Sequence, residues 1–389
     1  MTIVNSSKAF SLVLPELIFG CGTIKKLPEI LKDYKVKKVS LLTDEGIIKS
    51  GIAEKVSSII KDSGVECEIF SDVEADPTLE NVKDAYNTCD KNTELLIGLG
   101  GGSPIDTAKI VSVMLKYKGD LEEYLGLDQV PGRGLPTIFI PTTSGTGSEV
   151  TKYCILSDKK EEIKKGIVSD YIIPDYAIVD PELTVTMPPK ITASTGIDAL
   201  IHAIEGYISP RANPITDLLA LEAINMIYFN LPISCADGSD LNARTNMAYA
   251  SMTAGIVLNG TGAGASHALA YPITSKYNLP HGDGCMLTFL ELLEFFVLSN
   301  VDKYRKMAEA VGVNTENMSC REAGMKGVEE IRRFAEYIDV PTTLSEVNMD
   351  KNDVKPFAEN VYKTQQRLLV NAPKEMSVED IMEIYKKSY

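Results

Sequence analysis

Apolar residues in the first half of the chain alternate between short continuous runs and stretches with helical spacing. Runs rich in β-type residues occupy positions 37–43, 65–70, 94–98, 136–141 and 176–180, and helical patterns fill 47–63, 79–90 and 104–116. Strands that alternate with helices in this way are typical of a parallel sheet covered by helices on both faces. We therefore expect an α/β domain in this half.

The pattern changes at Met187, Pro188 and Pro189, where two consecutive prolines interrupt both kinds of element. Beyond this point the strand signals fade, and helical spacing recurs at 192–208, 216–230, 241–257, 285–298, 301–311, 321–338, 353–365 and 378–387. A chain of 389 residues is long for one hydrophobic core. We predict two domains, an α/β domain over residues 1–187 and a mostly helical domain over residues 188–389.

The charge balance narrows the classes of partner. The formal net charge is −15, with 39 Lys and Arg against 54 Asp and Glu. A chain this acidic lacks the basic footprint that nucleic acid or an anionic membrane surface requires. An anionic small substrate stays possible, but it needs a local cation that acts against the overall field.

The location of the protein is also constrained by the sequence. No apolar run is expected to be long enough to cross a bilayer, and the first residues lack the pattern of a secretory signal. Seven cysteines are scattered without a Cys-x-x-Cys pair, which indicates free thiols in a reducing compartment. We expect a cytoplasmic protein.

The chain contains only three histidines, and all of them fall within one stretch of 80 residues. They are His202, His267 and His281, and His202 follows Asp198 at a spacing of four. Residues four apart share one face of a helix, so this carboxylate and imidazole can converge on one point. Imidazole and carboxylate together suit divalent iron, zinc, nickel or cobalt. The alternative for Asp198 and His202 alone is an ordinary helix pair without a metal.

A glycine-rich loop joins the predicted strand at 94–98 to the helix at 104–116. The segment 100–109 reads GGGSPIDTAK, with Pro104 in the first helical turn. Glycines let the backbone approach a diphosphate, and the free N–H groups of a helix start can bind it. The alternative is a tight turn that packs against the sheet.

Two further features lie at the carboxyl ends of predicted strands. The segment 141–151 reads PTTSGTGSEVT, which suits a second nucleotide-binding loop, although a hydroxyl-rich helix cap is the alternative. Asp44 ends the strand at 37–43. It can accept hydrogen bonds from an adenosine ribose and would repel a 2′-phosphate, so NAD is favoured over NADP. A simple N-cap is the other interpretation of Asp44.

Taken together, these segments resemble the iron-containing (group III) metal-dependent alcohol dehydrogenases. The resemblance rests on 100–109, 141–151, the segment 195–206 (TGIDALIHAIEG) and 280–282 (PHG), and it runs from 15–22 (PELIFGCG) to the last helix. It implies an α/β N-terminal dinucleotide-binding domain and an all-α C-terminal metal-binding domain, a dehydroquinate synthase-like fold. Family members often form dimers or larger homo-oligomers.

The resemblance also implies roles for individual residues. The family's metal ligands map onto Asp198, His202, His267 and His281, with Fe(II) as the expected ion and Zn(II) as the other candidate. Its dinucleotide contacts map onto Asp44, Gly101, Gly102, Ser103, Thr142, Thr143, Thr146, Ile155 and Lys164. The cofactors expected are NAD(H) and one divalent metal.

One position departs from the family pattern. The family commonly has a histidine four residues after the ligand at position 267, and this chain has Tyr271, followed by Pro272. A tyrosine donates a hydrogen bond but is a poorer proton shuttle near neutral pH. The Tyr-Pro segment resembles the branch that reduces phosphonoacetaldehyde, a small anionic aldehyde, so we expect Tyr271 to contact the substrate.

The predicted function is a metal-dependent, NAD(H)-linked alcohol dehydrogenase or aldehyde reductase that acts on a small alcohol or aldehyde. An alternative is a reductase specialised for a small anionic aldehyde such as phosphonoacetaldehyde or sulfoacetaldehyde. A more distant alternative is a non-redox lyase of the same fold, which also uses NAD and a metal. The remaining alternative is a nucleotide-binding protein with a closed, structural metal site.

Overall fold

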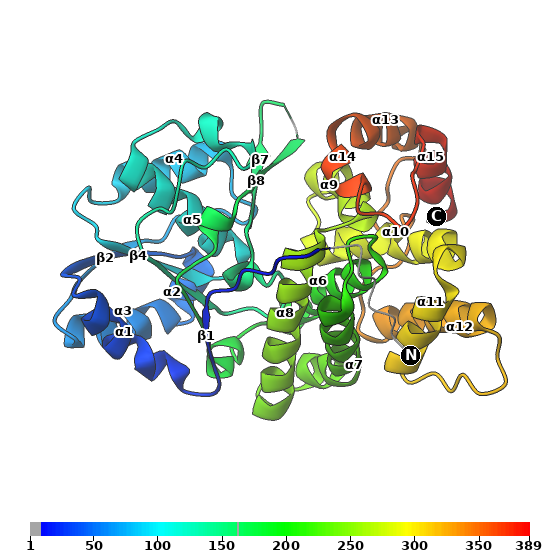
Figure 1. The fold of residues 1–389 in the computed structure, drawn as a ribbon, viewed down its shortest axis with the longest axis horizontal. Helices are drawn as coiled ribbons and strands as arrows, with labels where there is room; N and C mark the ends of the chain where they lie inside the picture. Colours follow the sequence, from blue (N-terminus) through cyan, green and yellow to red (C-terminus); the bar gives the residue numbers. More distant parts are fainter. Residues whose placement is uncertain (1–8, 162) are drawn as a thin grey trace. The chain divides into compact units, whose positions relative to one another are not determined.

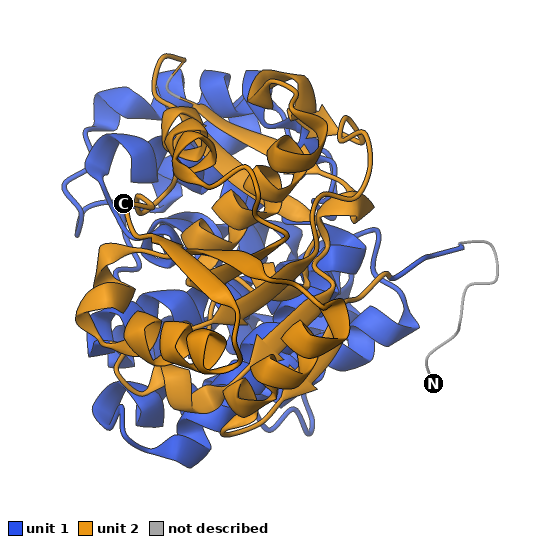
Figure 2. Cartoon of the chain, turned by 90° about the vertical axis from the view of Figure 1, so that its left-hand side faces the viewer, with its two compact units in different colours: residues 1–12, 188–389 blue, residues 13–187 orange. Residues whose placement is uncertain are grey.

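The computed structural model describes residues 9–161 and 163–389, and these residues form two compact units (Figure 2). One unit comprises residues 13–187 and is called the sheet unit below. The other comprises residues 188–389 together with residues 9–12, and it is called the helical unit.

The sheet unit is built on six parallel strands in its described residues, in the order β1-β9-β6-β4-β2-β3. The strands are β1 (Glu16–Phe19), β2 (Lys38–Leu42), β3 (Glu66–Phe70), β4 (Leu95–Gly100), β6 (Thr137–Pro141) and β9 (Tyr176–Val179). The helices between them are α1 (Leu27–Tyr34), α2 (Glu45–Lys49), α3 (Ile52–Asp62), α4 (Leu79–Thr88) and α5 (Gly102–Tyr117). The parallel sheet that the alternating pattern predicts is confirmed.

Helices cover both faces of this sheet, as Figure 1 shows. Side chains on one face of the sheet, such as Leu41 and Ile97, pack with α1 and α3. Side chains on the other face, such as Leu42, Leu96 and Phe139, pack with α4 and α5. Successive side chains of a strand point to opposite faces, so strands that are apolar throughout give the sheet two hydrophobic faces.

Two parts of the sheet unit differ from the sequence prediction. The single helix expected over 47–63 is divided into α2 and α3, because Gly51 between them has a φ of 77°. The sequence analysis did not predict the second, three-stranded sheet, in the order β5-β8-β7. Its strands are β5 (Gly126–Leu127), β7 (Tyr153–Asp158) and β8 (Ile163–Val168), and β7 and β8 pair antiparallel.

The helical unit contains the helices α6 to α15 in its described residues, and the mostly helical character predicted for the second half of the sequence is confirmed. Their bounds are α6 (Pro189–Ile208), α7 (Pro214–Ala236), α8 (Leu241–Thr261), α9 (Ala265–Tyr277), α10 (His281–Phe296), α11 (Val301–Ala310), α12 (Cys320–Tyr337), α13 (Val354–Thr364), α14 (Gln366–Leu369) and α15 (Val378–Lys387). Helix α9 was not predicted, because Pro272 lies inside it and small residues precede it.

Helix α7 corrects one expectation from the sequence. Its 23 residues are long and apolar enough to cross a bilayer by length and composition, whereas no such run was expected. One helix of this kind is weak support for a membrane span, because core helices of soluble proteins have the same composition. In this structure α7 packs against α6 and α8.

Candidate metal centre and nucleotide loops

Helix α6 carries three buried polar side chains on one face. Asp198, His202 and Glu205 follow one another at spacings of four and three, and each is at most 7% exposed. Such spacings place side chains above one another on the same side of a helix. Burying a polar group costs free energy unless it has a partner, so we expect these three side chains to bind other groups.

All three histidines of the chain converge on one oxygen atom of Asp198. The Nε2 atoms of His202, His267 and His281 lie 3.8, 3.6 and 3.9 Å from Asp198 Oδ1. These separations are too long for hydrogen bonds. They are close to the spacing of about 3.4 Å between ligand atoms that surround one ion at about 2.1 Å in a tetrahedron. The arrangement therefore fits the first shell of a metal ion.

Two buried polar atoms in this cluster lack a hydrogen-bond partner within the described part of the chain. Asp198 Oδ1 and His267 Nε2 are buried and have no hydrogen-bond partner among the residues that the structure describes. Burial alone would raise the pKa of the Asp198 carboxyl, but the surrounding imidazoles hold it below its usual range. Burial would lower the pKa of His267, whereas Glu205 and Asp198 raise it to about 10. Two buried carboxylates thus favour a positive charge at this point, which a divalent cation supplies.

Glu205 fixes the orientation of His267. Its Oε2 atom lies 2.7 Å from His267 Nδ1, and its carboxylate also accepts hydrogen bonds from the backbone N–H groups of Gly264 and Ser266. With the Nδ1 proton directed at Glu205, the Nε2 lone pair is available to a metal. Sequence reasoning gave Glu205 no role, although its place seven residues after Asp198 on one helix face was a usable signal.

A close approach of two helices brings His281 to the cluster. His281 is the first residue of α10, and a Cβ atom at the next residue, Gly282, would lie 1.9 Å from the backbone oxygen of Ser194 in α6. Only glycine permits this contact. The side chain of His281 is 40% exposed, which leaves that ligand position open toward solvent.

The cluster includes one residue that was not predicted. A ligand atom from each of Asp198, His267, His281 and Cys285 lies within 4.8 Å of the others, and Cys285 Sγ is 3.8 Å from His281 Nε2. Burial raises the pKa of the Cys285 thiol, so the thiolate that would bind a metal is disfavoured. Asp198 and the three imidazoles are therefore the better ligand set.

Tyr271 lies next to this cluster. It is in α9 one turn after His267 and is 6% exposed, and its ring centre is 6.0 Å from that of His281, with 30° between the ring planes. The structure therefore places Tyr271 beside the predicted metal ligands.

In the sheet unit, the two glycine loops and Asp44 come together at the carboxyl ends of β2, β4 and β6. A Cβ atom at Gly100, Gly101 or Gly102 would lie 3.2 Å from Asp44 Oδ2, 3.5 Å from Thr143 Cγ2 and 2.9 Å from Thr146 Cγ2, respectively. The backbone N–H of Thr142 donates to the carbonyl of Gly100 at 2.9 Å. Asp44 also caps α2 by accepting a hydrogen bond from the N–H of Ile47, so the alternative interpretation of this residue is present in the structure too.

The other predicted contacts connect to the same loop through acidic residues. Ser103 Oγ accepts a hydrogen bond from the N–H of Asp76, and the Asp76 carboxylate forms an ion pair with Lys164 on β8. Burial lowers the pKa of Lys164 to about 8. The N–H of Ile155 on β7 donates to Asp106 Oδ2 at 2.9 Å, so it is not free to bind a nucleotide.

Asp106 and Lys109 hold the two loops together, a role that sequence reasoning missed. Both are buried in α5. Asp106 Oδ1 accepts hydrogen bonds from Lys109 Nζ and from Ser148 Oγ, and Lys109 Nζ also donates to Ser148 Oγ and to the carbonyl of Tyr153. The positions of a lysine and an aspartate one helical turn apart, inside a largely buried helix, were the available signal.

Comparison with known proteins decides the family. A family model described as iron-containing alcohol dehydrogenase matches residues 15–181, and one described as the C-terminal part of the Fe-containing alcohol dehydrogenase family matches residues 192–389. The chain belongs to the iron-containing alcohol dehydrogenase family. As a member it is an NAD-dependent alcohol dehydrogenase, as the sequence predicted.

Relatives of this dehydrogenase match it over nearly its whole length. It is 36% identical over 374 residues to long-chain-alcohol dehydrogenase 1 of Geobacillus thermodenitrificans, covering 95% of this chain and 94% of the relative. It is 32% identical to sulfoacetaldehyde reductase of Bilophila wadsworthia, covering 96% and 97%. A crystal structure of 1,3-propanediol oxidoreductase is similar with a TM-score of 0.95 at 32% identity, covering 98% and 100%.

Proposed function

We propose that this dehydrogenase reduces small aldehydes with NADH at a metal held by Asp198, His202, His267 and His281. The observation that supports the ligand set most strongly is the convergence of three imidazole nitrogens on one buried, unpaired carboxylate oxygen. We further propose Fe(II) as the native ion. Zn(II) binds such ligands more tightly, so a purified sample can contain it when zinc is supplied.

The chain's own residues account for the remaining steps of binding and positioning. When bound, the metal polarises the substrate oxygen as a Lewis acid and NADH supplies the hydride. Glu205 keeps the Nδ1 proton of His267 in place, which leaves Nε2 unprotonated for ligation. Tyr271, which burial keeps protonated by raising its pKa, is a hydrogen-bond donor beside the cluster and a candidate substrate contact.

The nucleotide is proposed to bind at the loops of the sheet unit. The backbone of Gly101, Gly102 and Ser103 at the start of α5 suits the diphosphate, and the buried hydroxyl of Thr142, which has no hydrogen-bond partner among the described residues, suits a further contact. Thr143, Thr146, the side chain of Ile155 and Lys164 complete the proposed set. The carboxylate of Asp44 beside Gly100 favours NAD over NADP.

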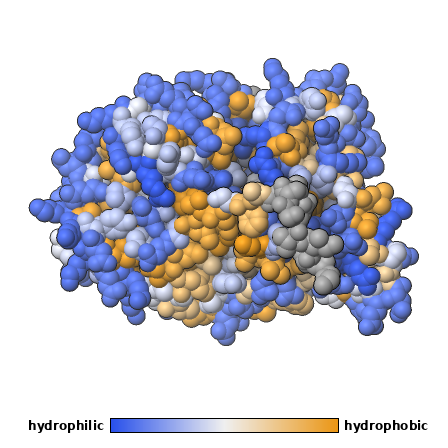
Figure 3. All heavy atoms as spheres, in the orientation of Figure 1, coloured by the Kyte–Doolittle hydropathy of each residue, from blue (hydrophilic) through white to orange (hydrophobic). Residues whose placement is uncertain are grey.

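The proposed location is the cytoplasm, and the proposed assembly is a homodimer or a larger homo-oligomer. None of the seven cysteines, all of which lie in the described residues, is in a disulfide bond, which suits a reducing compartment. Exposed apolar side chains on α7, among them Leu218 at 72% and Phe229 at 52%, support burial against a second copy. In Figure 3, apolar residues, drawn in orange, gather near the middle of the face in view.

The experiment for this function is a substrate panel. Anaerobic, Fe(II)-loaded enzyme is mixed with NADH and with propanal, 3-hydroxypropanal, lactaldehyde, sulfoacetaldehyde or phosphonoacetaldehyde, and absorbance at the NADH band is followed. We expect steady NADH consumption with at least one aldehyde, and none without aldehyde. A metal-loaded enzyme that turns over no member of the panel contradicts the proposal and favours a lyase or a structural metal site.

A further inference from the structure

Arg367 is a cation with an unsatisfied hydrogen-bond donor. It lies in α14, which packs against α9. Its Nη2 atom is buried and has no hydrogen-bond partner among the residues that the structure describes. A buried donor without an acceptor is costly, more so when it is charged. The position therefore suits an acceptor that comes from outside the chain.

The Arg367 guanidinium and the side chains grouped around Asp198 both lie near the ring of Tyr271. Arg367 Cζ is 6.0 Å from the centre of the Tyr271 ring, and the Tyr271 ring is 6.0 Å from that of His281. His281 Nε2 in turn lies 3.9 Å from Asp198 Oδ1. Burial raises the pKa of the Tyr271 hydroxyl, and the Arg367 guanidinium lowers it through its charge and a side-chain hydrogen bond.

We propose that Arg367 binds the anionic group of the substrate, and that the substrate class is a small aldehyde carrying a sulfonate, phosphonate or carboxylate. This inference rests on the proposed function. Hydride from NADH goes to the carbonyl carbon and a proton from solvent to its oxygen, giving the alcohol and NAD+, while the anionic group is unchanged.

The chemistry of arginine fits this role better than a packing role alone. A planar guanidinium presents paired N–H groups that match the oxygens of sulfonate, phosphonate and carboxylate. The net charge of −15 repels anions at long range, so an anionic substrate needs a cation of this kind close to the reacting carbonyl. The ring centre of Tyr271, in place of the histidine common in the family, lies 6.0 Å from this cation and 6.0 Å from the His281 ring.

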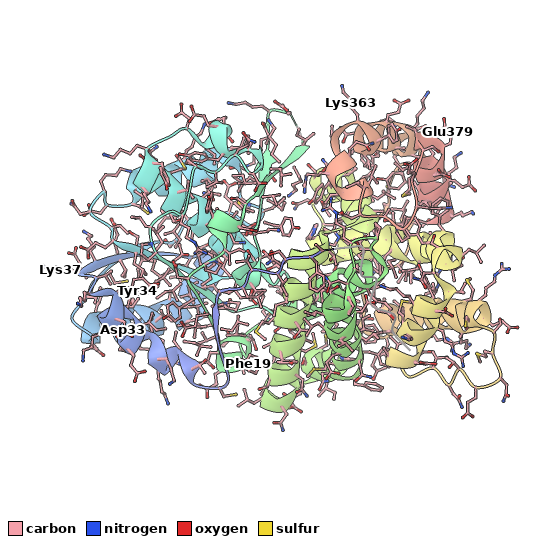
Figure 4. All side chains as sticks on the ribbon, in the orientation of Figure 1. Phe19, Asp33, Tyr34, Lys37, Lys363 and Glu379 are labelled. Carbon is pink, nitrogen blue, oxygen red and sulfur yellow. The ribbon has the colours of Figure 1, made fainter. Side chains whose placement is uncertain are left out.

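The test compares anionic aldehydes with a neutral aldehyde of similar size. Values of kcat and KM are measured with sulfoacetaldehyde, phosphonoacetaldehyde, glyoxylate and propanal for the wild type, Arg367→Gln and Arg367→Lys. The control is Lys363→Gln, which removes an exposed cation at the outer end of α13, labelled in Figure 4.

We expect the wild type to prefer at least one anionic aldehyde over propanal. Arg367→Gln should lower kcat/KM for that aldehyde by about 10- to 100-fold, mainly through KM, because a charge-assisted hydrogen bond is lost. Propanal should change by no more than about threefold, Arg367→Lys should retain part of the preference, and Lys363→Gln should match the wild type.

Two kinetic results would overturn the inference and leave the dehydrogenase function intact. One is propanal turnover with no preference for any anionic aldehyde. The other is an equal loss for both kinds of aldehyde in Arg367→Gln, which a packing role would give. Calorimetric binding of isethionate and of 1-propanol to metal-loaded enzyme gives a readout without turnover. Isethionate should bind more tightly than 1-propanol to the wild type alone, and equal binding to wild type and Arg367→Gln also overturns the inference.

Discussion

The carboxylate of Glu205 governs the orientation of a proposed metal ligand without touching the metal itself. It accepts hydrogen bonds from His267 and from two backbone N–H groups. In Glu205→Gln, an NH2 donor replaces one of the two acceptor oxygens. One of the three N–H groups that Glu205 binds would then face another donor and lose its hydrogen bond. We predict metal affinity about 10- to 100-fold lower than in the wild type, as for other lost outer-shell partners. Competition with a coloured chelator measures it.

The matched control for this prediction is Glu222→Gln, which changes an exposed glutamate on α7 of the same unit. Its metal affinity should equal that of the wild type. If Glu205→Gln also binds metal with wild-type affinity, the proposed orienting role of Glu205 is wrong.

A second glutamate gives a prediction about pH. Burial raises the pKa of Glu149 in the second loop to about 7, despite the opposing effect of Lys109. The folded state thus holds this proton more tightly than the unfolded chain, where the pKa is about 4.3. The free energy of unfolding therefore falls as pH rises from about 5 to 8, by about 3 kcal/mol from this group.

Glu149→Gln should remove that part of the pH dependence. Chemical unfolding of the wild type and the variant is measured at pH 5 and at pH 8. The free energy of unfolding of Glu149→Gln, relative to that of the wild type, should be higher at pH 8 than at pH 5, because glutamine cannot ionise. An equal difference between the two proteins at both pH values would show that Glu149 does not titrate in this range.

At the scale of secondary-structure elements, the contact between α6 and α10 sets the positions of the side chains grouped around Asp198. A Cβ atom at Gly282 would lie 1.9 Å from Ser194 O, so the two helix backbones must separate to accept alanine. We predict that Gly282→Ala displaces His281, costs about 1–3 kcal/mol of stability and weakens metal binding. Unfolding and metal titrations measure both effects, and an unchanged metal affinity would mean that His281 is not a ligand.

The sequence predicted the elements whose patterns are regular. The buried strands β2, β4, β6 and β9 were predicted, because their runs of apolar residues are continuous and are separated by amphipathic or buried helices. Strand β1 was missed since it has only four residues and is partly exposed. The β7–β8 hairpin was missed since both of its strands are partly exposed and β8 carries two lysines. Helix α9 was missed because Pro272 interrupts its pattern.

The candidate site was predicted in part for similar reasons. Asp198 and the histidines are residue types with specific chemistry, and Asp198 and His202 have helical spacing, so local sequence was sufficient to propose them as ligands. The spacing of Glu205 on α6 was a local signal that was not used. Cys285 and Arg367 are recognised only through contacts with segments far away in the chain. No local pattern reports which distant backbone N–H group or ring a side chain will meet.

For the whole molecule, each unit carries one part of the proposed chemistry. The cluster around Asp198 lies entirely within the helical unit, and the loops at Gly100–Gly102 and 141–151 lie within the sheet unit. Metal binding and NADH binding should therefore be separable by mutation, while turnover requires both.

The most direct measurement is a titration of Fe(II) into metal-stripped enzyme under anaerobic conditions, with NADH oxidation followed in the presence of a reducible aldehyde. The account predicts that activity rises from zero and saturates at about one Fe(II) per chain. Asp198→Asn should show no such rise while still binding NADH, and Asp302→Asn, an exposed aspartate on α11, should behave as the wild type. Activity that survives removal of the metal, or that is unchanged in Asp198→Asn, would contradict it.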